Sequence, residues 1–375
     1  MSRDGEADGD PGGHDEDSLD AGTFDVVVAG AGPAGAIAAR HLARAGRGVL
    51  MLDRLPPTAA RLGEVLPGAA RRLLTRVGLD EAALGAPAHA PVTGTIVVWG
   101  DETPQTHDAL RDPYGPALRL DRARFDAALR QASLAAGSRW SRTNVCDLEQ
   151  CGAHWILHRD KGDPIRARVI IDATGRSARL LRLMGQSRHS GVPLIALYQV
   201  ARPEKNAAME RTLIEALPEG WLYAGRLDED RWAIGYHTRP EDAARLRRDT
   251  IGRAALLSRA PHLRACLGAL DWEGPVLSRD ARSLAAATLC GPGWFAVGDA
   301  ALAFDPIAGQ GLFNALRTGL AAAEAILTTS EADTNAYATE LTRVASIYCE
   351  RRQTLYQAQG RWADQPFWRA HRVST

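Results

Sequence analysis

A glycine-rich turn near the start of the chain carries the clearest chemical signal. Residues 30–35 read Gly-Ala-Gly-Pro-Ala-Gly, a G-x-G-x-x-G pattern that lets the backbone approach a pyrophosphate at the positive end of a helix. Asp53 lies 23 residues after Gly30, where an acid accepts hydrogen bonds from adenosine ribose hydroxyls. This spacing predicts dinucleotide binding, and a glycine turn needed only for close packing is the alternative. The candidate cofactor-binding residues here are Gly30, Gly32, Pro33, Ala34, Gly35, Asp53 and Arg54.

The residues around this turn form the elements that must position it. Residues 24–29 are a β-branched run, residues 34–45 have helix-forming composition, and residues 48–52 are a second apolar run. This order predicts a β-α-β unit whose strands lie in a parallel sheet. Farther along we expect a buried strand at 167–173 and helices at 64–77, 121–136 and 311–327.

Two later segments distinguish FAD from NAD. Residues 169–175 read Val-Ile-Ile-Asp-Ala-Thr-Gly, and residues 293–300 read Gly-Trp-Phe-Ala-Val-Gly-Asp-Ala, with Asp-Pro-Ile-Ala-Gly-Gln-Gly-Leu at 305–312. They resemble the A-T-G and G-D-A motifs of the FAD-dependent hydroxylase superfamily, often called the p-hydroxybenzoate hydroxylase fold. The resemblance covers residues 24–327. It implies an α/β fold with a Rossmann-type FAD-binding domain, an interleaved mixed β-sheet substrate domain and C-terminal helices.

The resemblance also implies FAD contacts for particular residues. Asp299 matches the aspartate that bonds the ribityl and pyrophosphate region, and Pro306 lies in the segment along the isoalloxazine. Backbone N–H groups aimed at that ring stabilise negative charge on a reduced flavin. Arg122 resembles the family arginine that contacts the cofactor, with a solvated helix charge as the alternative. These implied contacts are Arg122, Gly175, Gly298, Asp299, Pro306, Gly309, Gln310, Gly311 and Leu312.

One departure places the chain in a side branch of the superfamily. Many aromatic hydroxylases read G-Q-G-x-N, whereas Asn314 comes one residue later here. Residues 63–67, Gly-Glu-Val-Leu-Pro, resemble the G-E-x-x-P loop that faces the flavin in halogenase-like and geranylgeranyl-reductase-like members. This resemblance implies cofactor contacts for Glu64 and Val65. Alternatively, Glu64 bonds only the loop backbone.

Motifs specific to two of the branch's activities are missing from the sequence. Its halogenases need a lysine after the G-E segment and a W-x-W-x-I-P motif, but the only lysines are Lys161 and Lys205, and residues 221–224 read Trp-Leu-Tyr-Ala. The sequence also lacks the Y-x-W-x-F-P segment of the geranylgeranyl reductases. With Arg-Trp-Ala-Asp-Gln-Pro-Phe-Trp at 361–368, the chain is most similar to monooxygenases that hydroxylate a protein-bound tryptophan during tryptophylquinone cofactor assembly.

We therefore expect a FAD-dependent monooxygenase that hydroxylates an indole or phenol ring through a flavin C4a-hydroperoxide, on a tryptophan-bearing protein or peptide partner. O2 supplies the oxygen, and NAD(P)H or a separate flavin reductase supplies the electrons. The alternatives are a small free aromatic substrate, a reductase or halogenase-like enzyme acting on a small molecule, and a non-catalytic flavoprotein assembly factor. We expect His237 to orient the ring or shuttle a proton. Candidate substrate contacts, with core packing as the alternative, are Tyr198, Trp221, Tyr223 and His237.

Composition limits the partners and the location. Residues 1–22 carry eight acids and one arginine and are expected to be a disordered acidic tail, whereas the rest carries 44 basic and 37 acidic residues, a net charge of +7. A basic body suits the docking of an acidic polypeptide. The longest mostly apolar run, 26–39, is too short to span a bilayer, and the five cysteines include no C-x-x-C pair. We expect a cytoplasmic protein with no metal, no membrane span and no nucleic-acid partner.

The motif positions predict a discontinuous domain organisation. Strand-like runs between the second and third FAD motifs indicate a separate domain inserted into the Rossmann elements. We assign residues 23–85, 117–190 and 278–327 to the FAD-binding domain. The predicted substrate domain comprises 86–116 and 191–277, and a C-terminal helical segment comprises 328–375.

Overall fold

The structure is a computed structural model that describes residues 22–54, 63–80, 84, 90–205 and 210–373. The predicted acidic tail at 1–22 therefore lies almost wholly outside the described residues. No helix of the described part is long and apolar enough to cross a membrane.

A parallel sheet forms the core of what we call the Rossmann domain. Its first strand is buried throughout the run Val26, Val27 and Val28, as expected for a strand covered on both faces. In sheet order, the parallel strands are β20 (Trp294–Ala296), β11 (Ile165–Asp172), β1 (Thr23–Ala29), β2 (Val49–Leu52) and β8 (Arg139–Ser141). The antiparallel strands are β19 (Cys290–Gly291) beside β20, β10 (His154–Arg159) beside β11, and β9 (Val145–Cys151) beside β10. The expected α/β Rossmann fold is confirmed.

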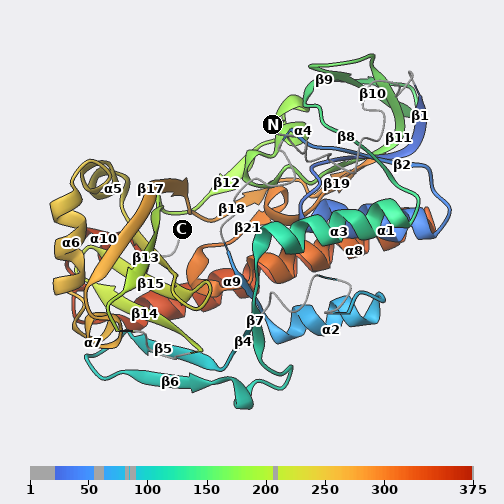
Figure 1. Cartoon of the computed structure of the whole chain (residues 1–375). Helices are drawn as coiled ribbons and strands as arrows, with labels where there is room; N and C mark the ends of the chain where they lie inside the picture. Colours follow the sequence, from blue (N-terminus) through green and yellow to red (C-terminus); the bar gives the residue numbers. More distant parts are fainter. Residues whose placement is uncertain (1–21, 55–62, 81–83, 85–89, 206–209, 374–375) are drawn as a thin grey trace, which may run out of the picture.

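Three helices cover this sheet in Figure 1, and α1 packs against both of the others. A Cβ on Gly319 would lie 2.2 Å from the Ala34 carbonyl oxygen, so this glycine lets α8 approach α1 closely. Short helix α4 (Arg179–Leu183) follows the A-T-G segment. The three covering helices are α1 (Pro33–Arg44), α3 (Arg122–Ala135) and α8 (Gly311–Thr328).

A second sheet of seven strands, which we call the substrate sheet, forms the other lobe in Figure 1. One face packs on α5 (Pro240–Leu246), α6 (Thr250–Ser258) and α7 (Pro261–Leu267). The other face contacts the C-terminal helices. In sheet order, the strands are β17 (Leu270–Asp280), β13 (Ile195–Pro203), β16 (Trp232–Thr238), β15 (Gly220–Arg226), β14 (Arg211–Leu217), β5 (Gly94–Val98) and β6 (Gln105–Asp108).

Small sheets connect the two lobes. One contains β3 (Val65–Leu66), β7 (Ala117–Arg119) and β4 (Ala90–Val92), and the other contains β12 (Arg188–Ser190), β18 (Leu284–Ala286) and β21 (Leu302–Ala303). The expected helix at 64–77 is wrong in its first turn, because β3 precedes α2 (Gly68–Arg76). Pro67 disfavours helical geometry at Leu66, and pairing with β7 supplies the hydrogen bonds instead.

The C-terminal segment is helical and joins the lobes. Helix α9 (Glu331–Ala358) bonds the Rossmann domain through Tyr337, whose hydroxyl donates to the Ala296 carbonyl oxygen. Near its other end, the Leu355 carbonyl oxygen accepts a hydrogen bond from Trp99 Nε1 at 2.6 Å. Helix α10 (Pro366–Arg372) buries Trp368 completely, and its indole N–H donates to the Leu217 carbonyl oxygen at 2.9 Å.

Candidate functional site

The turn between β1 and α1 packs against the A-T-G segment. Gly30 has a φ of +104°, and a Cβ there would lie 2.2 Å from the Ala173 carbonyl oxygen. A Cβ on Gly35 would lie 1.9 Å from the Gly30 carbonyl oxygen, so packing alone already requires both glycines. Helix α1 begins after Gly32 with no described side chain capping it and no acid in its first turn. Its amide donors therefore remain available to an anion.

The acid at the end of β2 is bound to the same turn. Oδ2 of Asp53 accepts a hydrogen bond from the Ala31 backbone at 2.9 Å, and the residue is 9% exposed. Arg54 lies exposed beside it. Asp53 thus fixes the glycine turn from the position that the sequence assigns to the ribose end of a dinucleotide.

A buried carboxylate shapes the A-T-G turn. Oδ1 of Asp172 accepts hydrogen bonds from the Thr174 backbone and hydroxyl at 3.0 and 2.6 Å, and Oδ2 accepts one from the Leu181 backbone at 2.9 Å. Burial raises the pKa of Asp172, and these hydrogen bonds oppose the shift. Gly175 follows with a φ of +66°, which favours glycine. Sequence reasoning gave Asp172 no role, although its place in the motif marks it.

Arginines surround the aspartate of the G-D-A motif. Arg188 donates to the backbone carbonyl oxygens of Asp299 and Arg176 at 2.7 and 2.8 Å. Burial raises the pKa of Asp299, and three nearby cations oppose that shift: Arg176, Arg188 and Arg122. Within the described part of the chain, Nε of Arg176 and Nε of Arg188 are buried and donate no hydrogen bond. The cluster therefore has cationic donors left for a pyrophosphate.

Sequence reasoning missed two of these arginines. Arg176 directly follows the A-T-G motif, a position that could have identified it. Arg188 lies on β12, and its burial lowers its pKa, with Arg176 beside it adding to the shift. No local pattern marks Arg188, because the strand pairing of β12 with β18 brings it to Asp299.

Arg122 links α3 to the G-E loop. Its guanidinium donates to both carboxylate oxygens of Asp126 at 3.1 and 3.0 Å and to the Gly63 carbonyl oxygen at 2.8 Å. The side chain is only 11% exposed, so the alternative of a solvated helix charge is wrong. Arg122 therefore fixes the loop that carries Glu64.

The segment expected along the isoalloxazine forms a 3-10 turn at Pro306–Ala308. Asp305 caps this turn by accepting a hydrogen bond from the Ile307 backbone at 3.0 Å, and it is 1% exposed. Its other carboxylate oxygen accepts hydrogen bonds from Tyr356 and Arg352, both on α9, at 2.8 and 3.3 Å. Burial raises the pKa of Asp305, and Arg352 opposes the shift. Helix α9 thus holds the turn in place.

The start of α8 lies next to this turn. Gly309, with a φ of +61°, and the following Gln310 and Gly311 are exposed, and no described side chain caps the helix. Leu312 is buried in the core. Asn314, the residue displaced from the hydroxylase pattern, points inward and donates to the Leu302 carbonyl oxygen at 2.9 Å. Helix α8 therefore offers a second open N-terminus.

The four predicted substrate contacts lie together on the face of the substrate sheet that contacts the C-terminal helices. The rings of Trp221 and His237 stack with centroids 3.5 Å apart and an interplanar angle of 6°. The Tyr198 hydroxyl and His237 Nε2 share a hydrogen bond at 3.2 Å. Gly235 leaves room for Tyr198, since a Cβ there would lie 2.6 Å from Tyr198 Cε1.

Burial separates these residues into two kinds. His237 and Trp221 are 0% and 1% exposed and so are core residues, whereas Tyr198 and Tyr223 are half-buried. Burial lowers the pKa of His237 to about 3 and keeps its imidazole neutral near pH 7. A neutral His237 can orient the Tyr198 hydroxyl through their hydrogen bond, a role that suits it better than carrying a proton as an imidazolium.

A carboxylate–phenol pair joins the G-E loop to the substrate sheet. Glu64 is buried, and its Oε1 accepts a hydrogen bond from the Tyr223 hydroxyl. The alternative that Glu64 bonds only the loop backbone is therefore wrong. Burial, followed by the charge of Glu64, raises the pKa of Tyr223 well above its usual value. Gly225 leaves space for this pair, since a Cβ there would lie 2.4 Å from the Tyr223 hydroxyl.

Both lysines lie away from this face. Lys161 is exposed between β10 and β11 of the Rossmann domain. Lys205 is exposed after β13, and its Nζ donates to the Ala265 carbonyl oxygen at 3.2 Å. Neither is placed to serve the loop at Glu64.

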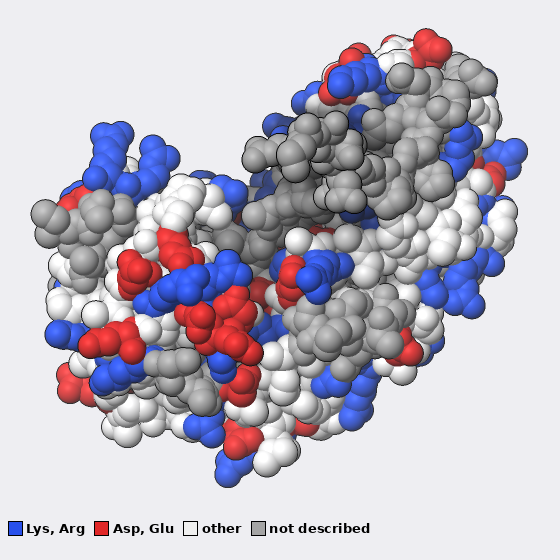
Figure 2. Space-filling view, in the orientation of Figure 1, with Lys and Arg blue, Asp and Glu red and all other residues white. Residues whose placement is uncertain are grey.

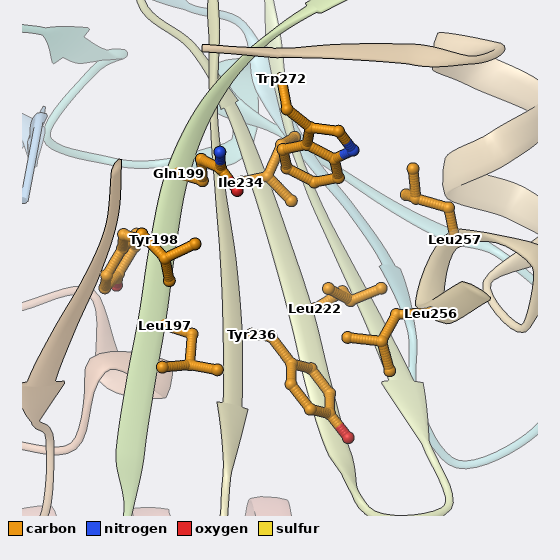
Figure 3. Close-up of a pocket in the computed structure, with 10 residues that line it drawn as sticks. Leu197, Tyr198, Gln199, Leu222, Ile234, Tyr236, Leu256, Leu257 and Trp272 are labelled. Atoms are coloured by element: carbon orange, nitrogen blue, oxygen red, sulfur yellow. The ribbon is translucent and has the colours of Figure 1, made fainter. Parts of the chain in front are cut away.

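The opposite face of the substrate sheet holds a small apolar cavity. Its volume is about 30 Å³, which suits a water molecule or two and excludes an aromatic ring. Figure 3 shows its lining between the strands and helix α6. The side chains that line it include Leu197, Leu222, Ile234, Tyr236, Leu256, Leu257 and Trp272.

Comparison with known proteins shows the family. The model of the FAD binding domain matches residues 23–215. Over 364 residues, the chain is 26% identical to LodB of Marinomonas mediterranea, whose name describes a FAD-dependent oxidoreductase, and the match covers 94% of this chain and 98% of LodB. It is 31% identical over 342 residues to the menaquinone reductase of Mycolicibacterium smegmatis, covering 80% of this chain and 75% of the reductase.

Solved structures share the fold. The myxobacterial chondrochloren halogenase, a variant of FAD-dependent halogenases, superposes with a TM-score of 0.83 at 25% identity, covering 94% of this chain and 86% of the halogenase. A peptidyl tryptophan dihydroxylase essential for tryptophylquinone cofactor biogenesis superposes with a TM-score of 0.70 at 24% identity, covering 93% of this chain and 79% of that one. These likenesses confirm the expected FAD-binding fold of the halogenase-like branch.

Proposed function

This chain belongs to the FAD binding domain family, in its halogenase-like monooxygenase branch, and from this premise we propose that it hydroxylates the indole of a tryptophan in a partner protein. One contact carries the proposal: Ile307, in the turn expected along the isoalloxazine, packs against the aromatic cluster of the substrate sheet. A ring bound beside this contact would lie among apolar and aromatic side chains. Such a site keeps water from a reactive oxygen species.

The described residues fit FAD. The open N-termini of α1 and α8 and the arginine donors near Asp299 suit a pyrophosphate and the electron-rich end of a reduced flavin. When bound and reduced, FAD activates O2 for transfer of one oxygen atom. The sequence contains no second G-x-G-x-x-G turn, so in this proposal NAD(P)H binds transiently without a Rossmann site of its own, or a separate flavin reductase supplies the electrons.

Two polar pairs would serve the substrate ring. Neutral His237 orients the Tyr198 hydroxyl, which is left to position the indole. Hydroxylation of an aromatic carbon ends with loss of the proton on that carbon. We assign this proton to the Glu64 carboxylate, reached through the Tyr223 hydroxyl that already bonds it.

One observation favours hydroxylation over halogenation: the branch's halogenases need a lysine after the G-E segment, and both lysines of this chain lie elsewhere. The fold does not separate the two activities, because the similar structures include a halogenase as well as a dihydroxylase that acts on peptidyl tryptophan. On the face shown in Figure 2, acidic and basic side chains are interspersed, so a partner that docks on this face would not meet a broad patch of one charge.

Mass spectrometry tests the proposal. The FAD-loaded protein is incubated with a reductant, isotopically labelled O2 and a tryptophan-bearing candidate partner, and we expect labelled oxygen on one tryptophan. Free tryptophan and a simple phenol are assayed in parallel. If only these small molecules gain oxygen, the protein substrate is wrong but the monooxygenase assignment stands.

Other outcomes would replace the assignment. Halogen incorporation in the presence of chloride or bromide would indicate a halogenase. Oxidation of the reduced flavin by a quinone, with no oxygen transferred to any aromatic substrate, would indicate a reductase. A flavin that no reductant bleaches would indicate an assembly factor that keeps FAD as a structural ligand.

A further inference from the structure

Arg119 is a buried arginine on the strand that pairs with the G-E loop. It ends β7 and is 2% exposed. Among the described residues, none accepts a hydrogen bond from its Nε, Nη1 or Nη2. Burial lowers its pKa, but a guanidinium stays charged under ordinary conditions. A charged group left buried without partners is unfavourable, so such a residue indicates a ligand.

The position of Arg119 places it in the wall between the flavin-facing loop and the substrate sheet. In the antiparallel pairing of β3 with β7, Arg119 lies opposite Val65, the residue that follows Glu64. Tyr223 and Glu64 are the first two groups whose charges oppose the lowering of its pKa. Arg119 therefore lies beside the carboxylate–phenol pair to which we assign the substrate proton.

A carboxylate near Arg119 has an oxygen atom that accepts no hydrogen bond from the described residues. Glu210, at the edge of β14, also acts on the charge of Arg119. Its Oε1 accepts a hydrogen bond from Arg226 at 3.1 Å, but its buried Oε2 accepts none from any described residue. Among the described residues, Arg119 thus has hydrogen-bond donors without an acceptor, and Glu210 has an acceptor without a donor.

Charge indicates what kind of ligand meets both needs. Two cations, Arg119 and Arg226, and two carboxylates, Glu64 and Glu210, balance one another. A neutral ligand keeps this balance, and a peptide group offers both a carbonyl acceptor and an N–H donor. A free amino acid presents a carboxylate and an ammonium group, whose removal from water is far more costly.

We propose that Arg119 and Glu210 bind a main-chain peptide group of the substrate, with Arg119 donating to the carbonyl oxygen and Glu210 Oε2 accepting the N–H. This inference rests on the proposed function and deepens it. The site selects tryptophan within a chain over the free amino acid. Arg119 and Glu210 are therefore specificity residues, separate from the contacts to the indole ring.

Ligand binding to the oxidised, FAD-loaded protein tests the inference without turnover. The probes are N-acetyl-tryptophan amide, free tryptophan and 3-methylindole. Their binding is measured by the change in flavin absorbance. We expect the amide to bind at least about tenfold more tightly than 3-methylindole, the usual effect of hydrogen bonds to a charged group. In Arg119→Met and Arg119→Lys this advantage should shrink to about twofold or less, because neither side chain offers the guanidinium fork.

Arg124→Met is the matched control, because Arg124 lies five residues away with a side chain that is 68% exposed. It should retain the full advantage of the amide. The unfolding temperature is measured alongside to show that Arg119→Met is folded. A merely structural arginine would leave the ranking of the probes unchanged.

The remaining outcomes separate the two proposals. The inference is wrong and the proposed function stands if 3-methylindole binds as tightly as the amide. The same holds if the amide binds more tightly and keeps this tighter binding in Arg119→Met. Tightest binding of free tryptophan, or loss of FAD from Arg119→Met, also overturns the inference. If none of the three probes binds, the indole substrate is wrong and the inference fails with it.

Discussion

Removing the guanidinium of Arg352 leaves the Asp305 carboxylate, which is 1% exposed, without its cationic partner. The carboxylate keeps hydrogen bonds from Ile307 and Tyr356 at 3.0 and 2.8 Å, whereas its ion pair with Arg352 Nε, at 3.3 Å, is broken. Breaking one side of a buried ion pair costs about 3–5 kcal/mol. Because the carboxylate keeps its two other hydrogen bonds, we expect Arg352→Met to lower the free energy of unfolding by about 3 kcal/mol, the lower end of this range. Since domains are stable by roughly 5–15 kcal/mol, the variant should still fold.

The assay is urea unfolding at saturating FAD, followed by tryptophan fluorescence, on the parent, Arg352→Met, Asp305→Asn and the double variant. The double variant removes both charges, so we expect it to be about 2 kcal/mol more stable than the sum of the single effects predicts. Arg343→Met on the same helix is the control, since its side chain is 61% exposed and its ion pair with Glu340 should contribute under about 1 kcal/mol. Equal losses of stability in Arg352→Met and Arg343→Met would refute the reasoning.

Further measurements address the cofactor, the proton and the pH dependence. Arg188→Met should weaken FAD binding about tenfold or more in a fluorescence titration of the apoprotein, because it removes a cationic donor at Asp299; unchanged affinity would remove Arg188 from the cofactor site. Tyr223→Phe should lower the rate of oxygen transfer about a hundredfold while FAD stays bound, because Glu64 loses its connection to the ring; an unaltered rate contradicts the proton assignment. Burial lowers the pKa of His237 and of His371 to about 3. As the pH falls below the unfolded-state pKa of about 6.5, only the unfolded chain takes up these protons. The free energy of unfolding therefore falls by up to about 1.4 kcal/mol for each unit of decrease in pH and for each histidine. The urea midpoint of His237→Gln should therefore depend less steeply on pH between about 6 and 4 than that of the parent, and an equal slope would contradict this origin.

The sequence alone identified the FAD-binding half of the molecule, because its determinants are local. Gly30 and Gly35 belong to one strand–turn–helix unit, and their spacing is set by the packing of neighbouring backbone atoms. Asp299 and Gly175 each lie three residues after the end of a strand of the same parallel sheet. Carboxyl ends of parallel strands meet at one edge, so motifs in this position converge on one ligand.

Tertiary structure decided which polar groups meet at the substrate side. The Glu64–Tyr223 pair joins residues 159 positions apart, and Trp221 donates to Tyr356 across 135 positions. The expected helix at 64–77 failed at its start for the same reason, since β3 takes its hydrogen bonds from β7 far along the chain. Periodicity and spacing report on neighbours in sequence, whereas strand pairing and the burial of Arg119 depend on how distant strands align.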